Sequence, residues 1–214
     1  LPFNSDEYNV AHPALSKDAT KLFFASDMPG GFGGMDVYVS EKESGRWGPP
    51  INLGPEVNTE GHEIFPYSAA DGRVYFASDG LIGLGGLDIY FVEEKGEGVY
   101  SSPENLGFPI NTIADDFGIM FNETGTCGFL SSDRAGGAGG DDIFTFKKTA
   151  IPVEILAYDE KIGKENGVLE GVSVAIDCKE ETLVTDAQGK IIIDMKLNKC
   201  CNFAASLEGY QDNT

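Results

Sequence analysis

Residues 22–38 read LFFASDMPGGFGGMDVY, and closely similar stretches occur twice more along the chain. Residues 74–90 read VYFASDGLIGLGGLDIY, and residues 129–144 read FLSSDRAGGAGGDDIF. Each copy places a Ser-Asp pair before a glycine-rich loop and a second aspartate after it, so the copies indicate an internal repeat. The repeated aspartates, at intervals of 52 and 54 residues, are Asp27, Asp79 and Asp133, then Asp36, Asp88 and Asp142.

A second motif precedes each copy and keeps the same phase. It reads PFNSDEY from Pro2, EVNTEGHE from Glu56 and PINTIADD from Pro109. We call these segments the asparagine motifs, after Asn4, Asn58 and Asn111. Asn-Leu-Gly stands ahead of the second and third motifs, at 52–54 and 105–107. Two motifs that stay in phase over three copies confirm a repeat of about 50 residues.

Each repeat has room for four short antiparallel strands, in the second copy at 65–69, 73–78, 87–93 and 99–102. Val, Ile, Tyr and Phe dominate these runs, while Gly, Pro, Asn and Asp separate them. Four strands per repeat of this length are typical of a β-propeller blade. The sequence therefore predicts an all-β chain in which residues 1–149 form about three four-stranded blades, entered partway through the first. Propellers close with about four to eight blades, so we expect an open arc or blades supplied by another chain.

The repeat stops after Lys147 and Lys148, and a different pattern follows. Short alternating runs, clearest at 172–177 and 190–194, are separated by glycines and acidic turns. Residues 150–214 are therefore predicted to form a small β-sandwich that is cut short at Thr214. The linker, about 148–152, is too short to let the two domains tumble freely.

Composition excludes several classes of partner. The chain has 214 residues, with 15 Lys+Arg against 35 Asp+Glu and a formal net charge of −20. Nucleic acid and anionic lipid are bound through clustered Lys and Arg, so we expect neither as a partner. No apolar run approaches the ~20 residues of a membrane helix, so direct membrane insertion is not expected. The chain begins at Leu1 without a signal peptide, which indicates a processed chain or an internal fragment.

Nothing in the sequence points to catalysis or to a cofactor. Two histidines are present, His12 and His62, but neither a Gly-x-Ser-x-Gly turn nor the HExxH pattern of zinc proteases. Glycoside hydrolysis needs two closely placed acids, and no pair stands out among the 35. The three arginines stand at different places in their repeats, so we do not expect them to converge on a carboxylate as in sialidases: Arg46, Arg73 and Arg134. We therefore predict a protein that is not an enzyme.

The four cysteines match no zinc pattern of the CxxC type. They are Cys127, Cys178, Cys200 and Cys201. Two interpretations stay open: a disulfide from Cys178 to either Cys200 or Cys201, or four small buried thiols.

Two sets of loops are expected on one face of the blades. In a four-stranded antiparallel blade, the loop that enters the first strand and the loop between the second and third strands lie on the same side. The second set comprises the glycine-rich loops, 28–35, 80–87 and 134–141, which we call the glycine loops. The first set is the asparagine motifs, which carry the candidate acidic face: Asp6, Glu7, Glu60, Glu63, Asp115 and Asp116.

The repeated aspartates and the apolar loop residues each have two interpretations. The aspartates either accept backbone N–H bonds in tight loops or partly bind a cation such as Ca²⁺, which takes about six to eight oxygens. No EF-hand spacing is present, and we assign no metal ligands. The apolar residues either form a protein-docking surface or fold back over the blade: Met28, Phe32, Met35, Leu81, Ile82, Leu84 and Leu87. The third glycine loop lacks comparable bulk, so docking would favour the first two blades.

The repeats resemble those of a known family. Tyr-Phe-Ala-Ser-Asp at 75–79, the glycine loop and Asp-Ile-Tyr at 88–90 are similar to PD-type, TolB-like propeller repeats of Bacteroidota cell-envelope proteins. Residues 170–172, 185–190 and 208–210 resemble a carboxypeptidase-regulatory-like domain, an accessory fold that implies no peptidase activity. This order is similar to the middle of OmpA-family envelope proteins, among them a component of the type IX secretion system.

The resemblance implies a periplasmic protein that is associated with the outer membrane and binds other cell-envelope proteins, such as secretion-system components. Peptidoglycan binding in that family belongs to a domain absent from this sequence. We therefore expect a non-catalytic protein-interaction scaffold. The alternative is a carbohydrate-binding or carbohydrate-active propeller, which exposed aromatics beside paired carboxylates would support. Trp47, the sole tryptophan, stands in WGPPINLG, which favours packing of the fourth strand over stacking on a sugar.

Overall fold

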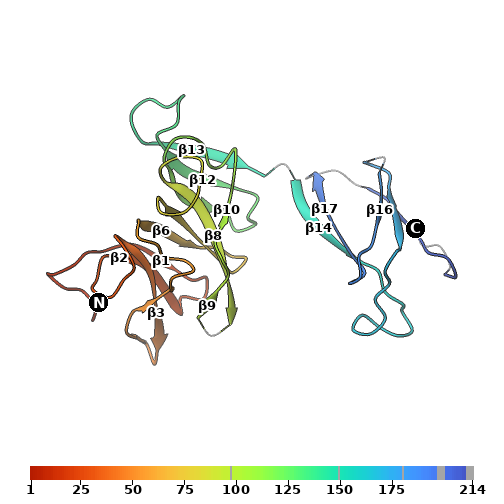
Figure 1. Ribbon diagram of the computed structural model, residues 1–214, viewed down its shortest axis with the longest axis horizontal. Coiled ribbons are helices and arrows are strands. Elements are labelled where there is room, and N and C mark those ends of the chain that lie inside the picture. Colours follow the sequence, from red (N-terminus) through yellow and green to blue (C-terminus); the bar gives the residue numbers. More distant parts are fainter. Residues whose placement is uncertain (97, 149, 180, 197–200, 211–214) are drawn as a thin grey trace. The chain divides into compact units, whose positions relative to one another are not determined.

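The computed structural model of the chain describes residues 1–96, 98–148, 150–179, 181–196 and 201–210. These residues form strands and loops, and the predicted all-β class is confirmed. Within them there is no helix of the length and hydropathy that crossing a membrane requires. The chain divides into two compact units, Leu1–Lys147 and Lys148–Thr214 (Figure 1). Each unit is described by itself.

The first unit contains three antiparallel sheets, one for each repeat. The first sheet consists of β1 (Val10–Leu15), β2 (Lys21–Ser26), β3 (Asp36–Glu43), β4 (Arg46–Trp47) and β5 (Ile51–Asn52). The second consists of β6 (Glu63–Ser68), β7 (Arg73–Ser78), β8 (Asp88–Gly96), β9 (Val99–Tyr100) and β10 (Glu104–Asn105). The third consists of β11 (Asp116–Phe121), β12 (Cys127–Ser132) and β13 (Asp142–Lys147), as far as the chain is described.

The structure corrects the predicted strands in two respects. Two short strands, β9 and β10, both pair with β8 and replace the single fourth strand predicted at 99–102. Proline separates them at Pro103, and Pro49 and Pro50 separate β4 from β5, because proline has no N–H to donate to a ladder. The expectation that the chain enters partway through a blade is wrong, because the first sheet has the same strands as the second. Among the described residues, the third sheet has three strands, whereas the first two sheets have five each.

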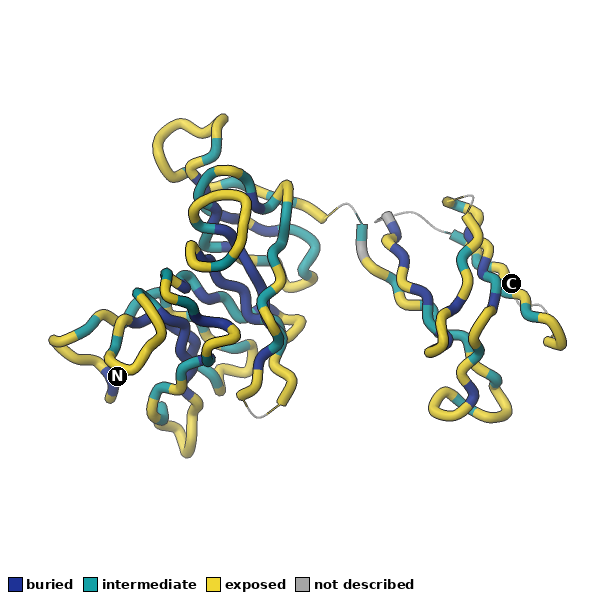
Figure 2. The backbone as a smooth tube through the Cα atoms, viewed as in Figure 1, coloured by how far each residue is buried: buried dark blue, intermediate teal, exposed yellow. Residues whose placement is uncertain are grey.

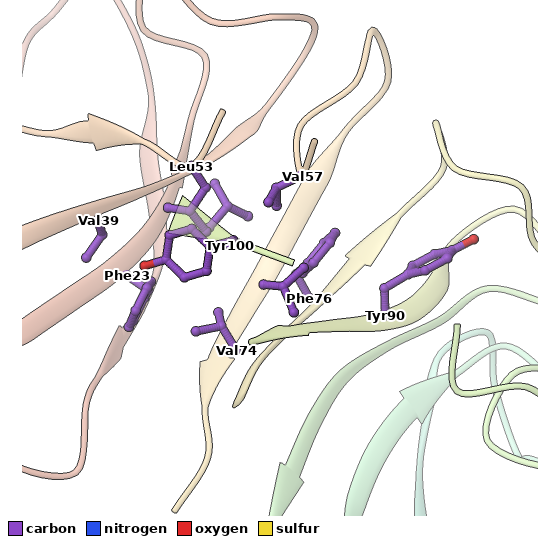
Figure 3. Packing of buried hydrophobic residues seen from close by; sticks show 10 residues of the cluster. Phe23, Val39, Leu53, Val57, Val74, Phe76, Tyr90 and Tyr100 are labelled. Atoms are coloured by element: carbon purple, nitrogen blue, oxygen red, sulfur yellow. The ribbon is translucent and has the colours of Figure 1, made fainter. Parts of the chain in front are cut away.

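The second strand of the first two sheets, β2 and β7, is buried because both of its faces are covered (Figure 2). Neighbouring side chains on a strand point to opposite faces of the sheet. Phe23 of β2 accordingly packs with Val57 and Phe76 in a cluster between the first and second sheets (Figure 3). Phe24, the next residue, packs on the opposite face, where its ring stacks on Phe3 at a centroid distance of 4.8 Å.

The same packing joins the second sheet to the third. Tyr75 and Ile89 of the second sheet form one buried cluster with Ile119 and Leu130 of the third. The three sheets are thus stacked face to face like neighbouring blades, and the first unit is a partial β-propeller.

The first strands of the three sheets lie beside one another, and each of them has a bulge at the same position. The bulge places a residue at positive φ in each strand, at His12 (52°), Phe65 (52°) and Gly118 (61°). The His12 ring stacks on Phe65 with centroids 3.9 Å apart, and Phe65 stacks on Phe117 at 5.0 Å. Burial of the His12 imidazole in this stack lowers its pKa.

A buried asparagine holds each sheet to the next. The Asn58 side chain, 2% exposed, accepts a hydrogen bond from the Val37 N–H at 2.8 Å and donates one to the Val37 carbonyl at 3.0 Å. Asn111 makes the same two bonds with Ile89, both at 2.8 Å. The side-chain amide thus bonds both main-chain groups of one residue at the strand edge, as a neighbouring strand would. We call this arrangement the asparagine joint.

Replacing Asn58 with alanine is expected to destabilise the first unit by about 2 kcal/mol, because it leaves the Val37 N–H buried without an acceptor. Urea unfolding followed through the fluorescence of Trp47, the only tryptophan, reports on this unit. Asn4 belongs to the same motif but is exposed, so Asn4→Ala is the matched control and should change stability by less than about 0.5 kcal/mol. Equal effects of the two substitutions would contradict the importance of the joint.

The second unit contains two small sheets around one core. In one sheet, β14 (Ala150–Leu156) pairs with β17 (Lys190–Lys196). In the other, β15 (Ser173–Ile176) lies between β16 (Glu181–Val184) and β18 (Phe203–Ser206). The core between them consists of Val172, Val174, Ile176, Ile191, Ile193 and Met195.

A disulfide between Cys178 and Cys201 joins the end of β15 to the start of β18. The pairing of Ile176 with Phe203 brings these two cysteines opposite each other. Cys127 in the first unit is a free thiol, and Cys200 lies outside the described residues.

Removing the disulfide with the Cys178→Ser, Cys201→Ser double variant is expected to lower the stability of the second unit by about 3 kcal/mol, because the bond closes a loop across 23 residues. Hydrogen exchange of the β15 and β18 amides measures this loss. The Trp47 signal of the first unit should not change, and Cys127→Ser serves as the control. A shift of the Trp47 transition as well would contradict the assignment of this loss to the second unit.

Candidate interaction face

The glycine loops of the first and second sheets each lie on the asparagine motif of the sheet that follows. In the first pair, the Gly34 N–H donates to the Gly61 carbonyl at 2.8 Å, and the Met35 N–H donates to Nδ1 of His62 at 3.1 Å. In the second pair, the Leu87 N–H donates to a carboxylate oxygen of Asp115 at 2.8 Å. Both kinds of loop therefore share one rim of the first unit, which we call the loop face.

Glycine is required where the two loops touch. A Cβ on Gly33 would lie 2.3 Å from the Thr59 carbonyl oxygen, and one on Gly85 would lie 2.1 Å from the Ala114 carbonyl oxygen. These are backbone atoms and cannot be moved cheaply. The backbones therefore approach each other directly, and the hydrogen bonds fix the position of the loops.

The repeated aspartates bond backbone amides. Asp27, Asp79 and Asp133 accept from the N–H of Asn9, His62 and Asp115, at 2.5, 2.7 and 2.7 Å. The second set accepts from its own glycine loops, as Asp36 does from Phe32 at 2.7 Å. Across the described residues, one group of three possible metal ligands has its ligand atoms within 4.8 Å of one another: Asp177, Cys178 and Cys201. Its two cysteines are disulfide-bonded, and it lies in the second unit.

The structure corrects two residues of the predicted acidic face. Glu63 and Asp116 are fully buried, and each turns back to bind a threonine four residues earlier. The Glu63 carboxylate accepts from the Thr59 N–H at 2.8 Å, the Thr59 hydroxyl at 2.7 Å and the Ser78 hydroxyl at 2.6 Å. Of the other predicted acids, Asp6, Glu7 and Glu60 are exposed and Asp115 is half-buried.

Arg134 forms an ion pair with the second buried carboxylate, Asp116. Its guanidinium pairs with Asp116 and also donates to the carbonyls of Pro109, at 3.0 Å, and Ile110, at 2.5 Å. This arginine is therefore committed to holding the third asparagine motif. Arg73 is separately engaged, with Glu93 at 3.1 Å.

The predicted docking residues divide into two groups. Met28 packs on the cluster that contains Phe3 and Phe24. Leu81 packs against the core between the first two sheets, and Met35 is half-buried. Phe32, Ile82 and Leu84 instead project from the loop face, and Ile82 is 99% exposed. The two interpretations of these loops therefore apply to different residues.

Sequence reasoning missed one apolar residue of this face. Ile113, in the third asparagine motif, is 92% exposed. It precedes Ala114, whose carbonyl contacts the second glycine loop at Gly85, so it stands beside Leu84 on the rim. The signal was present in the sequence, because Ile113 occupies the position of Glu60 in the second motif. We call Ile82, Leu84 and Ile113 the apolar tips.

Burial makes the stability of the first unit depend on the protonation of Glu63. Loss of hydration in its buried site raises the pKa of the Glu63 carboxyl above its ordinary value of 4.5. The folded chain thus holds this proton more tightly than the unfolded chain. The associated stability is fully present below pH 4.5 and is lost as the pH rises through the raised pKa.

Replacing Glu63 with glutamine is expected to remove this loss, because an amide does not ionise, and its one oxygen can still accept from the Thr59 and Ser78 hydroxyls. The difference in unfolding free energy between the variant and the wild type should grow in favour of the variant from about pH 5 to about pH 8. Urea titrations followed through Trp47 measure it. Glu60→Gln, at an exposed acid of the same motif, should run parallel to the wild type; a parallel Glu63→Gln curve would contradict the assignment.

Three stacked sheets with hydrogen-bonded loops on one rim define a repeat-built partial β-propeller. No family model and no curated protein matches the chain. Among solved structures it is similar to a putative TolB from Agrobacterium tumefaciens, with 16% identity and a TM-score of 0.45 over 88% of this chain. It is also similar to TolB from Acinetobacter baumannii, with 14% identity and a TM-score of 0.42 over 86%. The chain spans 50% and 43% of those proteins. At this distance the likenesses carry no functional argument.

Proposed function

We propose that this chain is a non-catalytic protein-interaction scaffold of the bacterial cell envelope and that its loop face is the docking surface. The observation that carries this proposal is the exposure of the apolar tips on a backbone fixed by hydrogen bonds between sheets. Exposed apolar side chains rimmed by polar residues are typical of protein interaction sites. A rigid face loses little conformational entropy on binding.

The charge of the face favours a particular kind of partner. Glu60, Asp79 and Asp133 are exposed on the same rim, and the chain as a whole has a net charge of −20. A partner with an apolar centre and a basic surround would complement it, and its association would be faster at low salt. Phe32 supplies a fourth apolar contact at the first glycine loop.

The resemblance of the repeats and the disulfide support the proposed location. The repeats resemble those of Bacteroidota OmpA-family envelope proteins, which supports a periplasmic chain associated with the outer membrane. The Cys178–Cys201 bond suits an oxidising compartment such as the periplasm. The proposed setting is the type IX secretion system, where the PorE component has a similar domain order. The second unit, as a carboxypeptidase-regulatory-like domain, would act as a spacer or second contact.

The carbohydrate-binding alternative receives less support from the geometry. Trp47 is half-buried at the edge of the first sheet, and the Lys42 ammonium lies 5.4 Å from its ring centroid. Two of the predicted acids are buried against threonines, so they do not form a pair open to a sugar. The apolar tips of the loop face are aliphatic, and the exposed aromatic residues of its loops, Phe32 and Phe108, come from different sheets.

The test replaces Ile82 and Leu84 with aspartate together. We expect the variant to fold like the wild type, because both side chains are exposed, and to lose more than about 90% of captured envelope protein in pull-downs from mildly solubilised envelopes. Val99→Asp, at an exposed position of β9, is the matched control and should retain capture. A photo-crosslinker at position 82 identifies the contacting protein. Capture that survives the double variant, or binding confined to a glycan array, would refute the proposal.

A further inference from the structure

The outer edge of the third sheet is open where the same edge of the first two sheets is filled. In the first sheet, β5 and the asparagine joint cover the edge of β3, and in the second sheet β10 and Asn111 cover the edge of β8. Among the described residues, no strand or asparagine covers the corresponding edge of β13. Ile143 on this edge is 76% exposed, and Phe129 and Met120 on the same face of the sheet are also exposed.

The strand register identifies the residue of β13 whose N–H and carbonyl correspond to those that the asparagines bond in the first two sheets. Val37 pairs with Ala25, Ile89 pairs with Ala77, and Ile143 pairs with Ser131 at the same place in their sheets. The N–H and carbonyl of Val37 bond Asn58, and those of Ile89 bond Asn111. The Leu53 and Leu106 N–H groups add a bond to the same two carbonyls, each at 3.1 Å. The N–H and carbonyl of Ile143 are therefore the third pair of this kind.

The glycine loop beside it is preformed and unoccupied. The Asp142 carboxylate accepts from the Ala138 N–H at 2.8 Å and the Gly139 N–H at 3.1 Å, as Asp36 does in its own loop. In the described structure a Cβ on Gly139 or Gly140 would meet nothing within 4 Å. Gly33 and Gly85, at the position of Gly139, touch the next asparagine motif. The third glycine loop therefore leaves room for an asparagine motif.

The two filled edges show what fits. Residues 52–59 read NLGPEVNT and residues 105–112 read NLGFPINT, so both follow the pattern Asn-Leu-Gly-x-x-x-Asn-Thr with an apolar residue before the second asparagine. The first asparagine donates to the loop aspartate, as Asn52 does to Asp36 at 2.7 Å. The apolar residue, Val57 in the first case, packs against Phe23. Phe129 stands at the position of Phe23 in the third sheet.

We infer that the open edge of β13 is a docking site for an extended Asn-Leu-Gly-x-x-x-Asn-Thr segment that belongs to another blade of the same repeat. The segment would pair with β13 as an added strand, which is a common mode of peptide recognition. A second copy of this chain is the weaker occupant, because its two complete segments already fill its own joints. This inference does not depend on the loop face being a docking surface.

The experiment uses the whole chain and a fluorescein-labelled peptide of residues 50–63, PINLGPEVNTEGHE, in a buffer of about 0.15 M salt to screen the acids on both sides. Fluorescence anisotropy should show saturable binding, and hydrogen exchange should show new protection of the Ile143 amide. The peptide with Asn58→Ala should bind at least about tenfold more weakly. The Ile82→Asp, Leu84→Asp variant should bind the peptide like the wild type.

Gly139→Val tests the site without disturbing the fold, because its side chain would enter open space in the free chain. It should weaken the peptide by at least about tenfold, while Ala135→Val, at an exposed position of the same loop, should not. No binding at about 1 mM peptide, or equal binding of the Asn58→Ala peptide, would overturn the inference. Self-association of the chain that Gly139→Val abolishes would overturn it in favour of a second copy.

Discussion

The first unit depends on one interaction, in which a side-chain amide bonds both the N–H and the carbonyl of one residue at a strand edge. Asn58 bonds Val37, and Asn111 bonds Ile89, from positions that are nearly inaccessible to water. Because a buried peptide group without a partner is costly, the motif that carries the asparagine must follow the preceding sheet closely. This brings Val57 into the core between the sheets, and it sets the two loop types against each other on one rim. The apolar tips are therefore presented by a backbone that the joints hold in place.

Much of the fold could be predicted from the sequence, because the turn residues and the alternating apolar residues recur at the same places in each repeat. Loops, strands and sheet order follow from motifs that return in phase. The split of the fourth strand was missed because two-residue strands leave almost no periodic signal. The disulfide partner of Cys178 was undecided between adjacent cysteines, since only the register of β15 and β18 selects Cys201.

The candidate face was predicted less completely, for a physical reason. Counting acids places them on a segment but does not say which way each side chain turns. Glu63 and Asp116 turn inward because a threonine four residues earlier offers both an N–H and a hydroxyl, and that spacing is visible only once the role is known. Ile113 was overlooked because the motif was interpreted as acidic throughout. Within this motif, the residue directly after the threonine, Glu60 or Ile113, is exposed. The acid four residues after the threonine, Glu63 or Asp116, is buried.

In this unit the asparagine at the beginning of one repeat bonds the N–H and the carbonyl of a residue in the sheet before it. The contacts involve backbone atoms and a single amide, so they do not tell one neighbour from another. Duplication or loss of a whole repeat would leave every remaining link intact. In an assembly built this way, the joints do not set the number of blades, and each blade can diverge at the exposed loop positions that carry the apolar tips.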